Sequence, residues 1–245
     1  MPEQTESDGE ITHDTLLRGR VKLLQPRRGF RSSLDPVLLA GFIEPPYGDF
    51  LDIGCASGAL SFLLLAKDAF ARGIGIEIQP RLATLAEQGR EANGFGDRFR
   101  VITADVRVEG AVPTQTFDLV ATNPPFRPVG EGVLPPQSEK AMANHEVTLG
   151  LSGWLDVAAA ALRVGGRLAT IFPFDRWEDL QAGLGARGFS IMRARQVVPR
   201  VGDVPNRILI EATRSSVQTR VEPPLVVHEG EGFSSEVRRM VGEEP

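Results

Sequence analysis

The sequence predicts an α/β protein built on a doubly wound, seven-stranded and mostly parallel sheet. Between residues 49 and 213, short apolar runs alternate with helical patterns, as expected for strands joined by crossover helices. Only the proline- and glycine-containing segment 199–205 joins the last two expected strands, and it is too short to hold a crossover helix. The last strand should therefore pair antiparallel with its neighbour.

Four segments are expected along the chain. The first is acidic and poor in apolar residues, so it is expected to be disordered. The other three form a single domain over residues 16–245. The segments are the acidic tail 1–15, an N-terminal cap 16–47, a core 48–214 that carries the chemistry, and a C-terminal extension 215–245.

The elements follow from local patterns. In the cap, a strand at 21–24 and a turn at Gly29 precede a helix with Asp35 as its N-cap and Pro36 at its first position. The sheet strands are expected at 50–53, 73–77, 99–103, 117–121, 167–172, 191–198 and 207–213. The helices of the core are expected at 59–66, 80–93, 151–162 and 176–186.

The composition excludes several classes of protein. With 42% hydrophobic and 24% charged residues, the 245-residue chain is an ordinary globular protein with a sizeable core. No apolar run approaches the length of a membrane span, and the acidic N-terminus is unlike a signal or transit peptide. One cysteine and three histidines offer no disulfide framework and no metal-ligand spacing. We expect a cytoplasmic protein without metal or membrane contact, as a monomer or weak homodimer.

The most informative segment is Asn-Pro-Pro-Phe at 123–126, directly after an apolar strand. Consecutive prolines lack N–H groups and fix their own φ, so they hold the Asn123 amide and the Phe126 ring beside the strand end. An amide and a backbone carbonyl can accept both hydrogens of a planar amino group, while a ring stacks on the heterocycle that bears it. The segment therefore suits methylation of an exocyclic nitrogen, although an Asn-Pro turn that only ends a strand would read the same.

A second group of residues follows the first three strands. Gly54 and Gly58 permit positive φ and a close approach of backbone to ligand. Their G-x-x-x-G spacing differs from the dinucleotide fingerprint, and the preceding Asp52 would oppose a pyrophosphate but suit a cation such as S-adenosylmethionine. Glu77, at the end of the second strand, is placed to accept ribose hydroxyls, and Asp105 is placed to reach an adenine amino group.

These motifs resemble the class I S-adenosylmethionine methyltransferases of the Asn-Pro-Pro-Phe/Tyr type. Flanking segments are similar to the bacterial tRNA (adenine-37, N6)-methyltransferases that act on a valine tRNA, and the resemblance covers about residues 18–241. The flanks are the segments 25–35, 143–146, 208–212 and 223–227. The resemblance implies a Rossmann-like fold, S-adenosyl-L-methionine as cofactor and S-adenosyl-L-homocysteine as product.

The resemblance also implies roles for single residues. The side-chain oxygen of Asn123 and the carbonyl of Pro124 would each accept one amino hydrogen, and Phe126 would stack on the flipped base. The cofactor-binding residues would be Asp52, Gly54, Gly58, Glu77, Asp105, Asn123 and Phe30. Phe30 would cover the methionine end of the cofactor, and packing of the cap against the core explains this residue equally well.

The charge distribution points to a local contact with nucleic acid. A net charge of −5 argues against a general nucleic-acid binder. However, Arg27, Arg28 and Arg31 belong to a basic run at 18–31 that contains no acid, and a second arginine-rich stretch covers 187–220. We expect these three arginines, together with Pro125, to contact the substrate, although solvated loop and strand ends would have the same sequence.

Three hypotheses about function follow. The first is N-methylation of adenine in RNA, at N6 of adenine 37 in a valine tRNA. The second is methylation of another planar nitrogen, in a guanine of ribosomal RNA, a glutamine amide of a protein or a small molecule. The third is a cofactor-binding RNA-interaction module without catalysis, against which the intact segment 123–126 argues.

Overall fold

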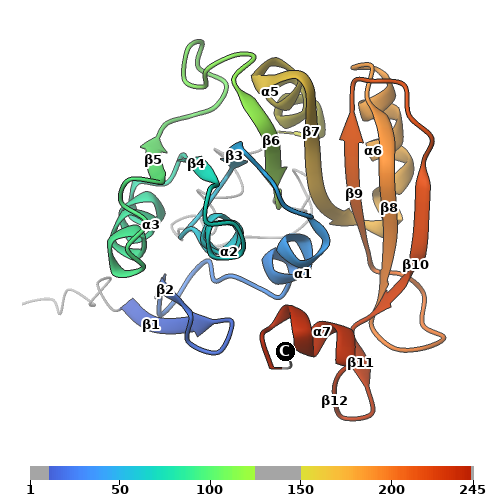
Figure 1. Ribbon diagram of the computed structural model, residues 1–245, viewed down its shortest axis with the longest axis horizontal. Helices are drawn as coiled ribbons and strands as arrows, with labels where there is room; N and C mark the ends of the chain where they lie inside the picture. The colour runs from blue at the N-terminus through green and yellow to red at the C-terminus, as the bar shows by residue number, and fades with distance from the viewer. Residues whose placement is uncertain (1–10, 125–149, 244–245) are drawn as a thin grey trace, which may run out of the picture.

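The computed structural model describes residues 11–124 and 150–243 (Figure 1). Its main strands are β3 (Asp49–Ile53), β4 (Arg72–Glu77), β5 (Phe99–Thr103), β6 (Phe117–Thr122), β7 (Leu162–Pro173), β8 (Ser190–Val198), β9 (Arg207–Thr213) and β10 (Arg220–Val226). Over the described residues they form one eight-stranded sheet in the order β10-β8-β9-β7-β6-β3-β4-β5. β9 is antiparallel to both β7 and β8, as its short connection predicts. The doubly wound α/β class is confirmed.

The sheet has one strand more than the seven that the sequence predicts. The added strand, β10, lies at the edge and runs parallel to β8. Pro223 and Pro224 hide this strand from a sequence pattern, because proline cannot donate to a ladder. Both prolines fall where the pairing register shifts, between Glu222 and Leu225, so the interrupted ladder tolerates them.

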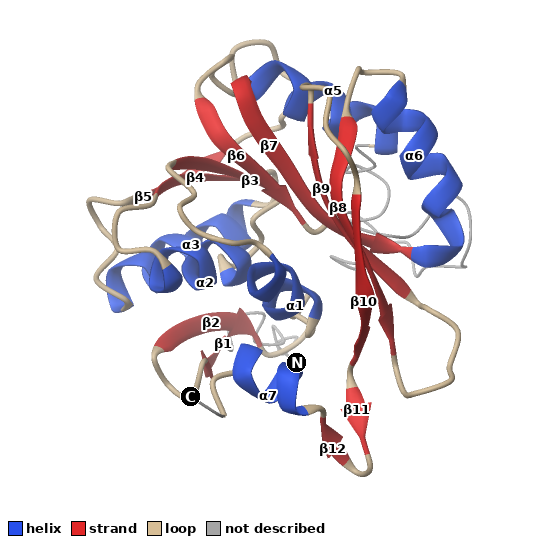
Figure 2. Cartoon of the chain, turned by 45° about the vertical axis from the view of Figure 1, so that its right-hand side comes forward, coloured by secondary structure: helices blue, strands red, loops and turns tan. Residues whose placement is uncertain are grey.

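Helices cover the two faces of the sheet. The helices are α1 (Asp35–Phe42), α2 (Ala59–Lys67), α3 (Pro80–Ala92), α5 (Leu151–Ala161), α6 (Trp177–Gly185) and α7 (Ser235–Met240), with a short 3-10 helix η1 (Phe174–Arg176). α1, α2 and α3 lie on one face, and α5 and α6 lie on the other (Figure 2). Successive residues of β3 alternate between the layers, with Phe50 in the α1–α2 core and Leu51 in the α5–α6 core. None of the described helices is long and apolar enough to span a bilayer.

The N-terminal cap begins earlier than the sequence predicts. Residues 11–15, expected to be disordered, belong to β1 (Ile11–Leu16), which pairs antiparallel with β2 (Val21–Pro26). The acidic composition masked this strand, because its order comes from pairing with β2 and not from its own apolar content. Residues 1–10 lie outside the described part of the chain. The helix α1 begins at Asp35, one residue earlier than predicted, with Leu34 as its N-cap.

Side-chain contacts fix the cap on the core. Asn93, at the end of α3, accepts from the Lys22 amide at 2.8 Å and donates to the Lys22 carbonyl at 2.7 Å. Leu24 of β2 packs against Leu82 and Leu85 of α3. The Asn93 side chain thus bonds the backbone of β2 much as a neighbouring strand would, and it holds the hairpin against the end of α3.

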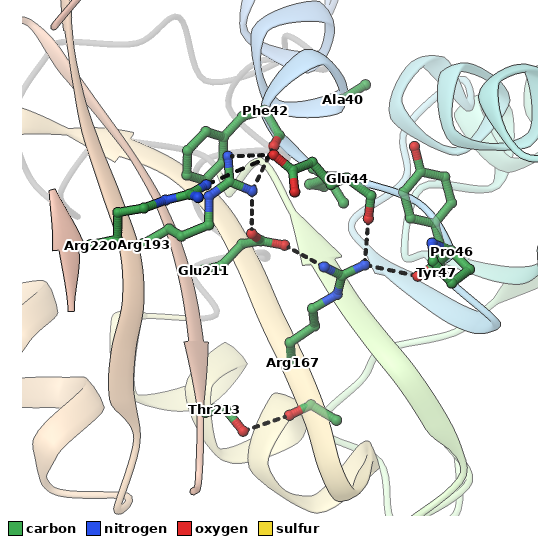
Figure 3. Close-up of polar contacts among 12 residues, drawn as sticks. Ala40, Phe42, Glu44, Pro46, Tyr47, Arg167, Arg193, Glu211, Thr213 and Arg220 are labelled. Carbon is green, nitrogen blue, oxygen red and sulfur yellow. Dashed lines mark hydrogen bonds and ion pairs between the residues drawn. The ribbon is translucent and has the colours of Figure 1, made fainter. Parts of the chain in front are cut away.

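A buried carboxylate joins several strands to the connection after α1 (Figure 3). Glu211 of β9 is 1% exposed and pairs with Arg167 of β7 at 3.1 Å and with Arg193 of β8 at 2.8 Å. Arg167 also donates to the carbonyls of Glu44 and Pro46, at 2.6 and 2.9 Å. The network therefore connects the centre of the sheet to the segment that leads from α1 into β3.

Replacing Glu211 with alanine should destabilise the fold by about 3 kcal/mol or more, because two guanidinium groups would lose a partner that water cannot reach. Urea unfolding followed by circular dichroism measures this change. Asp179→Ala is the matched control, since Asp179 pairs with Arg176 but is 61% exposed, and its loss should cost less than about 1 kcal/mol. Equal losses in the two variants would contradict a structural role for the buried network.

Candidate active site

The candidate site lies where the order of the sheet reverses. β3 pairs with β4 on one side and with β6 on the other, and all three strands are parallel. Their carboxyl ends therefore open at one edge of the sheet, and α2 and α5, the helices that come after β3 and β6, lie on opposite faces. In open α/β sheets this switch point is where ligands bind. The residues singled out in the sequence analysis at the ends of β3, β4, β5 and β6 all lie along this edge.

The turn after β3 keeps its backbone open toward this edge. Gly54 has φ +72° and Ala56 has φ +48°. The amides of Gly54 and Cys55 both donate to the Ile76 carbonyl, at 2.9 and 3.1 Å, which hooks the turn onto β4. A Cβ on Gly54 would meet nothing within 4 Å, so the turn presents bare backbone to open space. This is the surface that a ligand can approach closely.

Gly58 serves packing as well as the turn. It has φ +92° as the N-cap of α2, and a Cβ there would stand 2.5 Å from the ring of Phe62. The sequence pattern predicts a contact with ligand for both glycines. The structure shows a further reason for the second one, which is that the helix must begin tightly against its own aromatic core.

Two buried carboxylates face the turn from β3 and β4. Asp52 is 1% exposed and accepts a hydrogen bond from the Ser61 hydroxyl at 2.6 Å. Glu77 is 5% exposed and accepts from the amides of Ala56 and Gln79, at 2.9 and 2.8 Å. The Ala56 amide belongs to the glycine turn and the Gln79 amide lies just before α3, so this carboxylate ties the turn to the segment that follows β4. Ser61 was missed by sequence reasoning, since a serine inside an apolar helix gives no distinctive signal.

Burial dominates the titration of both acids. It raises the pKa of Asp52 to about 7, while the Ser61 hydrogen bond acts in the opposite direction and the Glu77 charge raises it further. Burial also raises the pKa of Glu77, against backbone hydrogen bonds from Gln79 and Ala56. Two buried acids close to one another repel each other, and a bound cation would relieve that repulsion.

Asp105 follows β5 and already has a partner. The ladder pairs Glu77 with Thr103, so the ends of β4 and β5 lie side by side. The carboxylate of Asp105 accepts from the Arg107 guanidinium, with Nε 2.9 Å from each oxygen, and this interaction lowers the pKa of Asp105. Contact of Asp105 with an adenine stays a prediction, and in such a contact Arg107 would share the carboxylate.

The end of β6 presents an acceptor without a donor. The ladder between β3 and β6 runs to the pair Asp52 and Ala121, and beyond it the Thr122 hydroxyl donates to the Ile53 carbonyl at 2.9 Å. The next residue is Asn123, whose Oδ1 is buried and has no hydrogen-bond partner among the described residues. Leaving a buried oxygen unpaired costs about 1–3 kcal/mol, so Asn123 marks a place where a ligand can supply the missing donor. Pro124 is buried beside it.

Several predicted contacts lie elsewhere or outside the described residues. Pro125 and Phe126 belong to the undescribed segment 125–149, as does the flank 143–146. Phe30 lies between β2 and α1 and is 49% exposed. Leu24 of β2 packs near Ala56, which brings this end of the cap to the glycine turn. That position is consistent with a cover over a ligand at the turn.

The arginines of the cap differ in their surroundings. Arg27 and Arg28 are exposed at the end of β2. Arg31 instead donates to Asp14 and Thr12 of β1, both at 2.7 Å, and to the Pro26 carbonyl at 3.0 Å. Arg31 thus ties the loop to the hairpin, and the expected substrate contact rests on Arg27 and Arg28.

The second arginine-rich stretch is largely neutralised within the described structure. Arg193 pairs with Glu211 and Glu222, and Arg195 makes a bidentate pair with Glu236. Further carboxylate pairs are Arg187 with Asp156, Arg207 with Asp35 and Arg220 with Glu222. These side chains hold the edge strands and helices together, so the stretch 187–220 does not form the basic face that its sequence indicates.

A family model described as the methyltransferase small domain matches residues 35–172, which run from α1 to the end of β7. Curated relatives named tRNA1(Val) (adenine(37)-N6)-methyltransferase are also similar to the chain. The protein of that name from Porphyromonas gingivalis strain ATCC 33277 is 32% identical over 84% of both chains. The protein from Tolumonas auensis is 29% identical over 81% of this chain and 82% of its own.

Solved structures share the fold. A protein from Agrobacterium tumefaciens, described as a predicted O-methyltransferase, superposes with a TM-score of 0.68 at 24% identity, over 84% of this chain and 94% of that chain. Geranyl diphosphate C-methyltransferase from Streptomyces coelicolor A3(2), in complex with Mg²⁺, geranyl diphosphate and S-adenosyl-L-homocysteine, superposes with a TM-score of 0.54 at 11% identity, over 73% of this chain and 75% of that chain. At these identities the likeness describes the architecture alone.

Affinity for S-adenosyl-L-methionine should rise with pH up to about 7, the pKa of Asp52 in the ligand-free pocket. A cation favours the charged carboxylate, so binding below that pH must release a proton, and affinity should fall by up to about tenfold per pH unit. In the ligand-free protein the same raised pKa stabilises the fold at acid pH, and this stabilisation is lost as pH rises through about 7.

Calorimetry in buffers of different ionisation enthalpy counts the released proton. Asp52→Asn should bind more weakly and with a flatter pH profile. An affinity of the unmodified chain that does not change across this pH range would remove Asp52 from contact with a cationic ligand.

Proposed function

The chain belongs to the methyltransferase small domain family, and on that premise we propose that it methylates the N6 amino group of an adenine in RNA, at position 37 of a valine tRNA, with S-adenosyl-L-methionine as donor. The relatives named for this reaction support the choice of acceptor. We further propose that residues 16–245 form a single methyltransferase domain, made of the N-terminal cap 16–47, the catalytic core 48–214 and the C-terminal extension 215–245, and that the enzyme works in the cytoplasm.

The unpaired oxygen of Asn123 carries this proposal. It is buried, it follows the strand at the switch point, and it has no donor among the described residues. An exocyclic amino group supplies two N–H donors in one plane. Asn123 Oδ1 would accept one hydrogen and the Pro124 carbonyl the other, since the proline that follows leaves no local amide to compete for it. An exocyclic amino group would therefore supply the hydrogen-bond donor that Asn123 Oδ1 lacks.

The residues present also fit the cofactor. Glu77 would accept the ribose hydroxyls from the end of β4, and the open backbone at Gly54 would let the ligand approach β3. Asp52 would provide negative charge for the cationic methionine part. Asp105 and Phe30 complete the expected cofactor site, at the end of β5 and in the cap. When bound, S-adenosyl-L-methionine supplies an electrophilic methyl group on a sulfonium.

The protein's own contribution is orientation and charge. The adenine amino nitrogen is a poor nucleophile because its lone pair is conjugated with the ring. Hydrogen bonds to Asn123 and Pro124 would rotate that lone pair toward the methyl group and strengthen as the nitrogen becomes positive. The N–C bond forms as the S–C bond breaks, and the acidified nitrogen then loses one proton to solvent. Pro125 and Phe126 would hold the flipped base, with Phe126 stacked on its face.

Asn123→Ala should separate transfer from cofactor binding. We expect the methylation rate to fall by at least about 100-fold, because a contact that strengthens in the transition state is lost. The affinity for S-adenosyl-L-methionine should change little. Thermal stability should hold or rise, because alanine removes a buried oxygen that the fold leaves unpaired. Glu77→Ala is the contrasting variant, with cofactor affinity reduced about tenfold or more. An Asn123→Ala enzyme with the normal rate would refute the proposed mechanism.

The acceptor is tested by incubating the enzyme and methyl-labelled cofactor with total tRNA, ribosomal RNA and a protein release factor. Label should appear as N6-methyladenosine in valine tRNA, since an unpaired loop base costs least to extrude. A valine tRNA transcript with guanine at position 37 is the matched control and should stay unlabelled. Label found only in the protein, or as methylguanine in ribosomal RNA, would replace the proposed acceptor while leaving methyl transfer intact.

A further inference from the structure

The first hairpin and the last helix of the described chain meet beside α1. The turn that joins β1 to β2, at residues 17–20, lies next to α7 near the C-terminus (Figure 2). Between them, with α1 and α2 behind, is a hollow of about 400 Å³. Its lining includes the cations Arg20, Lys67 and Arg239 and the apolar side chains of Leu17, Leu63 and Met240. The hollow is separate from the switch-point site and takes no part in the chemistry proposed above.

Close packing holds this convergence in place. A Cβ on Gly41 of α1 would stand 2.7 Å from the Met240 side chain, and one on Gly242 would stand 3.1 Å from the Leu17 backbone. Leu17 itself is buried and belongs to the same core cluster as Val237 of α7. Replacing Gly41 would displace the Met240 side chain, and replacing Gly242, which has φ +81°, would strain its backbone against Leu17. The walls of the hollow are therefore fixed by the fold.

The turn has strained backbone angles, and its two arginines are exposed to solvent. Leu17, Arg18 and Gly19 have φ of +49°, +54° and +86°, which is costly for the two residues that carry a Cβ. Burial of the Leu17 side chain offsets that cost. As a result Arg18 and Arg20 are exposed, and Arg20 lines the hollow together with the exposed Arg239 of α7.

The charge around the hollow is positive and incompletely neutralised. Glu236 is the carboxylate among the lining residues, and Arg195 already holds it with hydrogen bonds of 2.6 and 2.8 Å. Arg20 donates through Nε to the Leu17 carbonyl, and Lys67 donates to the carbonyls of Ala40 and Ile43. Glu236 also attracts Arg239, and Glu44 attracts Lys67. These bonds use only some of the N–H groups of Arg20 and Lys67, and a guanidinium fork matches two phosphate oxygens.

We propose that this hollow binds the phosphodiester backbone of the RNA substrate, an inference that rests on the proposed function. A chain with net charge −5 needs a local positive surface to hold RNA. The apolar floor would pack against ribose, while Arg20, Lys67 and Arg239 contact phosphate. The carboxylates of an acidic peptide would also pair with the cations. A nucleotide backbone matches the hollow better, because its phosphates suit the cations and its ribose suits the apolar floor.

The position of the hollow suits an RNA stem that leaves the active site. α1 begins at Asp35, which pairs with Arg207 at the start of β9. Six residues later, about 9 Å along the same helix, Gly41 lines the hollow. β2 connects the same turn to the exposed Arg27 and Arg28, about 20 Å away near the glycine turn. Arg20 and Arg239 both lie outside the segment 35–172 that matches the family, where substrate selection can differ between members.

The test is a double variant, Arg20→Gln with Arg239→Gln. The matched control is Arg72→Gln with Arg100→Gln, which removes two exposed arginines from β4 and β5 with the same change in charge. Binding of valine tRNA is measured by fluorescence anisotropy over a range of salt concentrations. We expect the double variant to bind about tenfold or more weakly at low salt, with a salt slope smaller by about two, while the control keeps the slope of the unmodified chain.

Further measurements separate a binding role from a folding defect. Cofactor affinity, melting temperature and the single-turnover rate at saturating tRNA should match those of the unmodified chain. The single variant Arg239→Glu, on the exposed face of α7, should weaken tRNA binding in the same direction without touching the strained turn. An unchanged salt slope in the double variant, or an equal loss in the control, overturns the inference.

Two outcomes separate this inference from the proposed function. If the unmodified chain methylates tRNA and the double variant keeps its slope, only the inference fails. If the unmodified chain binds no RNA, the proposed acceptor and the inference both fail. If the double variant loses binding to polyglutamate but keeps full affinity for tRNA, the hollow is assigned to an acidic protein partner and the RNA contact is overturned.

Discussion

Glu211 lies at the centre of β9, shielded from water, and its two oxygens are shared by Arg167 and Arg193 from the strands on either side. A carboxylate in this position would be costly alone, so the strands must approach with both guanidinium groups in place. The same arginines continue outward, Arg167 to the backbone after α1 and Arg193 over the ring of Phe42 at 4.3 Å. One buried charge therefore fixes the antiparallel strands of the sheet and the segment that leads into β3. The candidate site lies at the carboxyl end of β3.

At that edge, function depends on how β6 stops. A strand that continued would satisfy its own acceptors, but prolines 124 and 125 end the supply of amide donors. The Thr122 hydroxyl closes the last contact to Ile53, and Asn123 is left with a buried oxygen that nothing described pairs with. The arrangement stores a small penalty in the free protein. In the proposed reaction a planar amino group would relieve it, and recognition of the acceptor would then follow from the way β6 ends.

The sequence carries much of this and conceals the rest for identifiable reasons. Parallel strands, the glycine turn and the acids at strand ends follow from short-range patterns, and these predict the class of fold. β1 and β10 escape because an acidic composition and a pair of prolines argue against strands, and only pairing with distant residues overrides them. The Ser61 contact with Asp52 and the Arg107 contact with Asp105 need side-chain geometry. Predicted roles for Pro125 and Phe126 fall outside the described residues.

Arginine is the residue for which sequence order misleads most. The stretch 187–220 reads as a basic surface, yet Arg193 and Arg195 are held by carboxylates that arrive from Glu211, Glu222 and Glu236. The partners lie 18 to 41 residues away in the chain, beyond any local pattern. Conversely, Arg20 and Arg239 lie almost a whole chain apart and line one hollow. A basic surface thus forms where the fold leaves cations that carboxylates do not fully neutralise. In an acidic protein, such a surface is where an RNA backbone is attracted most strongly.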